Sequence, residues 1–322
     1  MSNQSDGLAH RPVLYQEIIH ALRPIRDSRF VDCTLGAGGH AWGVLEESSP
    51  NGLLLGLEVD PQALTLANDR LAPFAERAIL IQASYVTLSA QLARLGWPTV
   101  DGVLLDLGVS AMQLDTPNRG FSFLSDAPLD MRFDPEGTLR AADLVNDLSV
   151  QELAELFFTY GEEPSAYPIA QAIVRSRPIE RTIELAEIIT KVVRGRKTSA
   201  GRRRSSKARI HPATRSFQAL RIAVNHELEA LESVLPQAVS ALKPGGRLAV
   251  ISFHSLEDRI VKRYFRRESR DCICPPRQPV CTCGHKASIV EVNRHPIGPG
   301  TEEIAKNPRS RSARLRVAEK VV

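Results

Sequence analysis

Short apolar runs alternate with segments of helical periodicity over the first third of the chain. The runs have the length and composition of β-strands and comprise Arg29–Cys33, Leu53–Leu57, Ala78–Ile81 and Val100–Leu105. Strands that alternate with helices in this way predict a parallel sheet. Consecutive apolar residues such as those at 53–55 are typical of strands whose two faces are both covered by helices. The pattern therefore predicts a doubly wound α/β core.

The alternation stops after Ser110 and resumes about a hundred residues later. Between them the chain shows only helical stretches, such as Val150–Thr159 and Ile183–Val193. We therefore expect a discontinuous core of residues 1–115 and 211–322, with a helical domain at 116–210 inserted in it.

The second part of the core is expected to begin with one long amphipathic helix over Ser216–Leu235. A turn at Lys243–Gly246 and a strand at Arg247–Phe253 follow it. Ser288–Asn293 and Leu315–Ala318 supply the last strands, but the sequence does not give their order in the sheet.

A glycine-rich turn directly follows the first predicted strand and opens a helix. It contains Gly36, Gly38 and Gly39 and ends at His40. Glycines at this place let the backbone approach a ligand at the carboxyl end of a strand. Twenty positions after Gly38, Glu58 ends the second strand, where a carboxylate accepts hydrogen bonds from the hydroxyls of a ribose. These features predict a nucleoside cofactor.

Several cofactor assignments are compatible with the glycine-rich turn. The spacing from Gly36 to Ala41 also satisfies the dinucleotide pattern G-x-G-x-x-G/A, and a tight turn without a ligand is a further alternative. Asp106 after the fourth strand and the segment Leu242–Gly246 before the fifth resemble class I methyltransferases, which use S-adenosyl-L-methionine. In that fold the end of the third strand lines the adenine, so Tyr85 is expected to stack on it.

Longer motifs along the whole chain resemble one family. They are Asp106–Ser110 with Gln113–Asp115, Arg119–Phe123, Pro128–Arg132, Tyr160–Glu163, His211–Ile222, Ile251–Lys262 and Asn307–Ser312. The chain is thus similar to the bacterial ribosomal RNA small-subunit methyltransferase H family, also called RsmH or MraW.

This resemblance implies a class I, Rossmann-like fold and methylation, with S-adenosyl-L-methionine, of the exocyclic N(4) amine of a cytosine in the decoding region of 16S ribosomal RNA. The inserted helical domain would then recognise RNA. Transferred by motif position, the cofactor-binding residues are Gly38, Gly39, His40, Glu58, Tyr85, Asp106 and Gln113. Glu58 departs from many relatives, which carry Asp there.

Asp106 and His254 are the predicted catalytic residues. The lone pair of the cytosine amine is delocalised into the ring, so the enzyme must position the amine and remove a proton. Asp106 is expected either to accept that proton or to orient the cofactor. His254 follows the fifth strand and should face the same crevice. Its structural alternative is a hydrogen bond to the start of the next helix, with Ser255 as the N-cap.

Positive charge concentrates between Lys191 and Arg215, a segment that contains no acidic residue. Its arginines and lysines predict a flexible loop that neutralises RNA phosphates, although a solvated charge run is the plainer interpretation. Phe121, Phe123 or Phe217 would stack on the target base or pack in the core. The net charge of +4 and a pI of about 8.9 agree with a nucleic-acid partner without requiring one.

Four of the five cysteines form two Cys-x-Cys pairs, Cys272 with Cys274 and Cys281 with Cys283. They would hold zinc or be free, redox-labile thiols, and the methyl transfer itself needs no metal. A disulfide framework would spread over the fold, so a reducing cytoplasm is expected. The polar first residues and the lack of an apolar run of roughly 18 residues predict a soluble protein without a membrane partner.

Three functions remain open on these residues. The leading one is an S-adenosylmethionine-dependent enzyme that acts on 16S ribosomal RNA, within the small ribosomal subunit, as a monomer or homodimer. A NAD-dependent oxidoreductase and a non-catalytic RNA-binding assembly factor are the alternatives. Cofactor binding separates the first two, and methyl transfer separates the first from the third.

Overall fold

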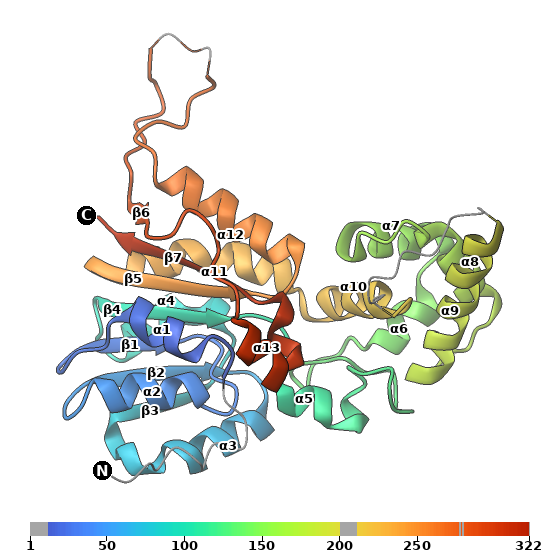
Figure 1. The fold of residues 1–322 in the computed structure, drawn as a ribbon, viewed down its shortest axis with the longest axis horizontal. Helices are drawn as coiled ribbons and strands as arrows, with labels where there is room; N and C mark the ends of the chain where they lie inside the picture. Colours follow the sequence, from blue (N-terminus) through green and yellow to red (C-terminus); the bar gives the residue numbers. More distant parts are fainter. Residues whose placement is uncertain (1–11, 200–210, 277, 279, 322) are drawn as a thin grey trace. The chain divides into compact units, whose positions relative to one another are not determined.

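A computed structural model describes residues 12–199, 211–276, 278 and 280–321 of the chain. The chain forms two compact units (Figure 1): residues 1–108 with 228–322, and residues 109–227. The predicted insert of 116–210 is thus shorter than the second unit. The difference arises because Val109, Leu114 and Phe217 pack into the core of the second unit.

The first unit is built on a seven-stranded sheet with the order β3-β2-β1-β4-β5-β7-β6. β1 to β5 run parallel, whereas β7 is antiparallel to both β5 and β6. The strands are β1 (Arg29–Asp32), β2 (Leu53–Glu58), β3 (Ala78–Gln82), β4 (Val100–Asp106), β5 (Leu242–Ser252), β6 (Ile289–Glu291) and β7 (Arg314–Lys320). The predicted strands are confirmed, and the predicted parallel arrangement is confirmed for β1 to β5.

Helices cover both faces of this sheet and bury its apolar side chains. One core cluster joins β1, β2, β4 and β5 to α4 (Leu88–Arg94), α11 (Glu227–Ala241) and α12 (Ser255–Glu268). The other joins them to α1 (Tyr15–Leu22), α2 (Gly39–Glu47) and α3 (Pro61–Leu71). The doubly wound α/β core is therefore confirmed. A further short helix, α13 (Thr301–Lys306), precedes β7.

The second unit is helical in its described part, with one apolar cluster as its core. Its helices are α5 (Ala111–Asp115), α6 (Ala141–Asp147), α7 (Val150–Gly161), α8 (Ala166–Arg175), α9 (Thr182–Ser199) and α10 (Thr214–Asn225). α7 and α10 approach closely at Gly161, where a Cβ atom would lie 2.7 Å from the backbone oxygen of Arg215. A side chain at that position would force the two helices apart.

The prediction of one long helix over Ser216–Leu235 is wrong. The chain breaks at His226, whose φ of 49° is left-handed and ends α10 before α11 begins. The two halves also belong to different cores, because Phe217 and Leu220 pack in the helical unit whereas Leu231 and Leu235 pack against the sheet. The boundary between the units thus coincides with the break.

The basic segment is also only partly the loop that was predicted. α9 continues beyond the expected end at Val193 and reaches Ser199, so the first residues of the segment are helical. The side chains of Lys191 and Arg194 are exposed on this helix. Five predicted cations, Arg202, Arg203, Arg204, Lys207 and Arg209, lie outside the described residues, and for Arg196 and Lys197 only the helical backbone is described.

Two smaller features bear on the sequence predictions. The expected turn at Lys243–Gly246 lies within the bounds of β5, where the pairing with β4 shifts its register between Val100 and Gly102. No helix in the described part of the chain is long and apolar enough to cross a membrane.

Candidate cofactor site

The carboxyl ends of β1 and β4 form the switch point of the sheet. β2 and β3 continue from β1 on one side, while β5 continues from β4 on the other. In open α/β sheets a ligand binds in the crevice outside the strand ends at this point. Asp32 ends β1, Asp106 ends β4 and Glu58 ends the neighbouring β2. The sheet therefore brings the two predicted carboxylates, Glu58 and Asp106, to one edge together with Asp32, which was not predicted.

The glycine-rich turn lies between β1 and α2 as predicted. Gly38 has a φ of 77°, a conformation that favours glycine, and it occupies the N-cap of α2. A Cβ at Gly39 would lie 2.5 Å from Cγ of Pro12, so this position has no room for a side chain. Since Gly38 has no side chain with which to cap the helix, the first N–H groups of α2 suit a ligand's acceptor atoms.

Both carboxylate oxygens of Glu58 accept backbone hydrogen bonds. The N–H of Gly36 donates to Oε2 at 2.8 Å, and the N–H of Asp60 donates to Oε1 at 2.9 Å. Burial raises the pKa of Glu58, and the backbone donors, the N–H of Val59 among them, oppose that increase. These bonds fix the side chain at the strand end, and a carboxylate with about four acceptor positions still has room for a ribose hydroxyl.

His40 and Asp106 present polar atoms that the protein itself does not satisfy. Oδ2 of Asp106 lies 3.6 Å from Nε2 of His40, which is beyond hydrogen-bonding distance. Both ring nitrogens of His40 and Oδ1 of Asp106 are buried and have no hydrogen-bond partner among the described residues. Buried polar groups are nearly always paired. These atoms therefore fit a polar ligand at the switch point.

Asp32 adds a third carboxyl to this edge. It is buried, and burial raises its pKa to about 7; the nearby carboxylates of Asp106 and Glu58 add to the increase, while His40 opposes it. The site thus gathers acidic groups that disfavour one another's charge. A ligand with positive charge would relieve this repulsion, whereas a pyrophosphate would increase it. The sequence prediction overlooked Asp32, because the groups around it come from separate elements: Glu58 from β2, Asp106 from β4 and His40 from α2.

His254 caps the start of α12. Its Nδ1 accepts a hydrogen bond from the N–H of Glu257 at 3.4 Å, which confirms the predicted hydrogen bond to the start of the helix. The N-cap, however, is His254 itself, so the assignment of the cap to Ser255 is wrong. Its Nε2 lies 3.0 Å from Oε1 of Glu257, without the alignment of a hydrogen bond. The predicted role in proton handling stays a prediction.

Tyr85 and Gln113 occupy different parts of the molecule. Tyr85 begins a short 3-10 turn three residues beyond β3 and packs against the core of the first unit. Gln113 belongs to the second unit, where its side-chain oxygen accepts the N–H of Ser110 at 3.1 Å in a capping box. A cofactor contact by either residue stays a prediction.

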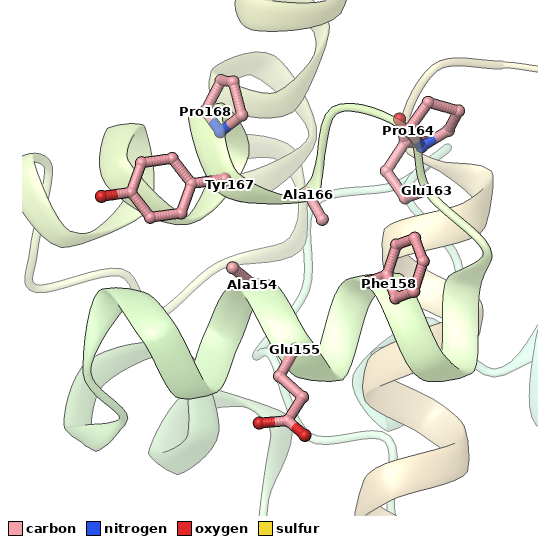
Figure 2. Close-up of a pocket in the computed structure, with 8 residues that line it drawn as sticks. All are labelled: Ala154, Glu155, Phe158, Glu163, Pro164, Ala166, Tyr167 and Pro168. Atoms are coloured by element: carbon pink, nitrogen blue, oxygen red, sulfur yellow. The ribbon is translucent and has the colours of Figure 1, made fainter.

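A hollow of about 590 Å³ in the helical unit lies between α7 and α8 (Figure 2). The rings of Phe158 and Tyr167 border it and are 68% and 55% exposed. Glu155 and Glu163 also border it, and the latter accepts the N–H of Ser165 at 2.8 Å. Two carboxylates make this hollow unsuited to a phosphate group.

A second hollow of about 370 Å³ in the same unit has aromatic and basic side chains on its border, together with one acidic residue, Glu187, whose Oε2 lies 3.9 Å from Nζ of Lys191. Phe123 stacks on His211 with ring centroids 4.5 Å apart, while Lys191 and Arg194 extend from α9 beside them. By contrast, Phe121 and Phe217 are buried. For these two rings the prediction of packing in the core, and not of stacking on the target base, is confirmed. Of the three predicted rings, Phe123 borders this hollow.

Comparison with known proteins agrees with this geometry. The family model of the MraW methylase family matches residues 7–321. The ribosomal RNA small subunit methyltransferase H of Dehalococcoides mccartyi is 51% identical over 313 residues, which cover 97% of this chain and 87% of that protein. Proteins of the same name from Thermomicrobium roseum and Oleidesulfovibrio alaskensis are 50% and 47% identical, over 97% and 99% of this chain and 94% and 98% of their own lengths.

The match extends along nearly the full length of the chain, so a cofactor-binding motif alone does not explain the similarity. The sheet with its switch-point site and the family match together confirm the predicted fold class, a class I Rossmann-like methyltransferase core. The chain therefore belongs to the MraW methylase family.

Proposed function

We propose that this protein transfers a methyl group from S-adenosyl-L-methionine to the exocyclic N(4) amine of a cytosine in the decoding region of 16S ribosomal RNA. The names of its relatives support the RNA class, since they denote methyltransferases of small-subunit ribosomal RNA. The observation that carries the proposal is the set of buried, unsatisfied atoms of His40 and Asp106 beside two further strand-end carboxyls.

This site fits S-adenosylmethionine better than a dinucleotide. The cofactor carries an activated methyl on a positive sulfonium and a positive ammonium group, which suit an acidic crevice. In our assignment Glu58 binds the ribose, Tyr85 stacks on the adenine, and Gly38, Gly39, His40, Asp106 and Gln113 complete the cofactor contacts. A NAD-dependent reaction would instead bring a pyrophosphate to the start of α2, beside the strand-end carboxyls of Asp32 and Asp106.

Asp106 is the proposed proton acceptor for the cytosine amine. Its Oδ1 is buried and lacks a partner among the described residues, and its backbone N–H is held by Oγ1 of Thr34 at 2.6 Å. A carboxylate fixed in this way would accept the amine proton and localise the nitrogen lone pair as the methyl group is transferred. His254 is the second candidate, and it would act from its place beside Glu257.

The helical unit is the proposed RNA-binding part. Lys191 and Arg194 would contact phosphates, and the stacked pair Phe123–His211 offers a flat surface to an unstacked base. This hollow is preferred over the one between α7 and α8, whose border is acidic. The enzyme would meet its RNA in the cytoplasm, within the small ribosomal subunit.

Transfer of labelled methyl from S-adenosylmethionine to unmodified small subunits and to naked 16S RNA tests the function. Nucleoside analysis should find the label in N(4)-methylated cytidine. Label in another nucleoside would contradict the base assignment, and no label with either substrate would favour the non-catalytic assembly factor. Calorimetry should detect binding of S-adenosylmethionine and none of NAD; the reverse would support an oxidoreductase.

A further inference from the structure

The loop between α12 and β6 contains four cysteines. It extends away from the sheet of the first unit (Figure 1). None of the described residues from 270 to 287 is buried, and the apolar side chains of Ile273 and Val280 are 39% and 70% exposed. Hydrophobic burial therefore does not hold this loop in shape, and short segments of this kind need another constraint.

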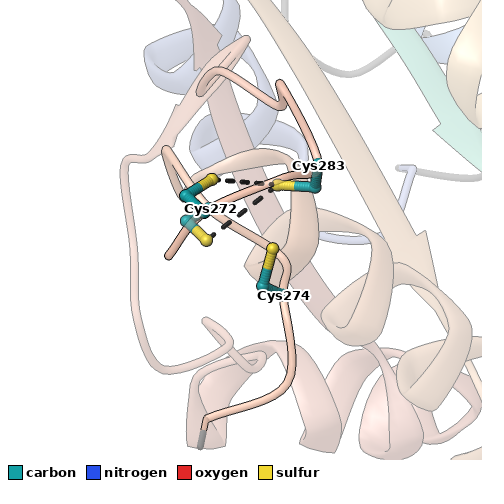
Figure 3. A group of neighbouring side chains, drawn as sticks. Cys272, Cys274 and Cys283 are labelled. Atoms are coloured by element: carbon teal, nitrogen blue, oxygen red, sulfur yellow. Dashed lines mark hydrogen bonds between the residues drawn. The ribbon is translucent and has the colours of Figure 1, made fainter. Parts of the chain in front are cut away.

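The sulfur atoms of the loop lie close together. The four Sγ atoms, from Cys272, Cys274, Cys281 and Cys283, are all within 4.8 Å of one another. Sγ of Cys283 is 3.6 Å from that of Cys281 and 3.9 Å from that of Cys272, and Figure 3 shows the labelled cysteines turned toward a common point. All four are free thiols, and these separations exceed the roughly 2.05 Å of a disulfide bond.

These separations agree with the ligand sphere of zinc. Four sulfurs bound tetrahedrally at about 2.3 Å from Zn²⁺ lie about 3.8 Å from one another. Four soft thiolates without an open position are typical of structural zinc or of an iron–sulfur cluster. A single ion of the size of zinc fits the narrow spread of these sulfurs.

Backbone donors hold the two Cys-x-Cys arms against each other. The N–H of Ile273, in the first arm, donates to Sγ of Cys283 at 3.5 Å. The N–H of Thr282, in the second arm, donates to Sγ of Cys274. The middle residue of each arm thus stabilises negative charge on a sulfur of the other, as a thiolate ligand requires.

Exposure of the thiols is a further sign of a ligand role. Cysteine is among the most buried residue types, as Cys33 is at 2% exposure, yet Cys272, Cys281 and Cys283 are exposed. His285 is not needed as a ligand, because its Nε2 lies 3.2 Å from the backbone oxygen of Arg267 at the end of α12.

We propose that Cys272, Cys274, Cys281 and Cys283 bind one Zn²⁺ ion as a structural tetrathiolate site that folds this loop. Four thiols lose up to four protons on binding and give a complex with a net charge of −2, which the basic residues of the same loop, such as Arg270 and Lys286, would partly balance. The site is independent of the methyl transfer, since it lies in a loop beyond α12 and not at the switch point.

Metal analysis of the full-length, untagged protein tests the proposal. The protein is purified under reducing conditions without chelator, and its metals are measured by mass spectrometry after gel filtration. About one zinc per chain is expected, with a marked loss in the variant that combines Cys272→Ser and Cys281→Ser. Thr282→Ser, which changes a residue between two ligands, is the matched control and should keep its zinc.

Cobalt substitution of the wild-type chain gives a second measurement that does not depend on the folding of a variant. Co²⁺ added to the metal-free protein should produce the visible bands and thiolate charge-transfer absorption of a tetrahedral sulfur site, and Zn²⁺ should remove them. The proposal is overturned if the reduced protein carries no metal and four reactive thiols, if it carries iron with sulfide, or if the serine variant retains its zinc.

Discussion

The two compact units of this protein hold their polar groups in opposite ways. At the strand ends of the sheet, Asp32 and His40 are buried, and backbone donors fix the carboxylates of Asp32 and Glu58. In the helical unit, Lys191 and Arg194 stand exposed on α9. The difference suggests a division of labour: a small rigid cofactor needs preorganised groups, whereas an RNA phosphate backbone is bound by accessible charge.

Because the groups at the strand ends are buried, a substitution at any one of them should cause a large loss of activity or affinity. Replacing a single oxygen of a buried, hydrogen-bonded carboxylate removes an interaction that no other group can supply. Removing one exposed cation removes only one of several phosphate contacts.

Replacement of Asp106 should have the largest effect. Asp106→Asn keeps the size of the side chain but cannot take a proton, so turnover with saturating cofactor and RNA is expected to fall about 100-fold or more. The rate of methyl transfer under single-turnover conditions measures the decrease. Asp101→Asn, on the same strand, is the control and should stay near wild-type turnover, because that carboxylate accepts the N–H of Arg29 at the opposite end of β4. Full turnover by Asp106→Asn would exclude it as the proton acceptor.

Replacement of Glu58 should weaken cofactor binding without slowing the chemistry. In Glu58→Gln one charge-assisted acceptor is lost, which corresponds to a dissociation constant for S-adenosylmethionine about 10- to 100-fold higher. Calorimetry measures the affinity, and turnover at saturating cofactor should stay nearly constant. Glu47→Gln, at an exposed position of α2, is the control. An unchanged affinity would remove Glu58 from the cofactor site.

Alanine substitutions at two glycines of the helical unit should change the free energy of unfolding in opposite directions. Gly161→Ala places a Cβ 2.7 Å from the backbone oxygen of Arg215 and should lower the free energy of unfolding by about 1–3 kcal/mol. Gly195→Ala on α9 meets no atom within 4 Å among the described residues and should raise it by up to about 1 kcal/mol. Urea unfolding measures both. A stabilising Gly161→Ala would contradict the close packing of α7 and α10.

Asp32 should give the site a pH-dependent stability. Its folded pKa of about 7 exceeds the ordinary value of 3.8, so the folded state binds more protons between these values. The free energy of unfolding of the wild type, relative to Asp32→Asn, should therefore fall as the pH rises from about 4 to about 7. Asp69→Asn, at an exposed position of α3, serves as the control and should show no such trend. A difference that does not change with pH would contradict the burial of an ionisable Asp32.

Most of the sheet and the glycine-rich turn could be predicted because their signals are short and contiguous. Each strand is a compact apolar run, and Gly38, Gly39 and Glu58 follow strand ends directly. The raised pKa of Asp32 could not be predicted in this way, because it depends on β1 lying between β2 and β4.

The helix break at His226 was missed for a different reason. The apolar stripe of α10 continues into α11, so periodicity alone describes one helix although the two stripes face different cores. Likewise, the continuation of α9 to Ser199 could not be predicted, because basic residues with glycine and serine are typical of loops. Tertiary packing decides both cases.

One pair of binding measurements tests the division of labour most directly. The affinities for S-adenosylmethionine and for 16S RNA are measured side by side in Glu58→Gln and in the double variant Lys191→Gln with Arg194→Gln, the latter over a range of salt concentrations. We predict that Glu58→Gln loses cofactor affinity and keeps RNA affinity. The double variant should keep cofactor affinity and bind RNA more weakly, with a salt dependence whose slope is smaller by roughly 1–2. Loss of both affinities in either variant, or unchanged RNA binding by the double variant, would contradict the account.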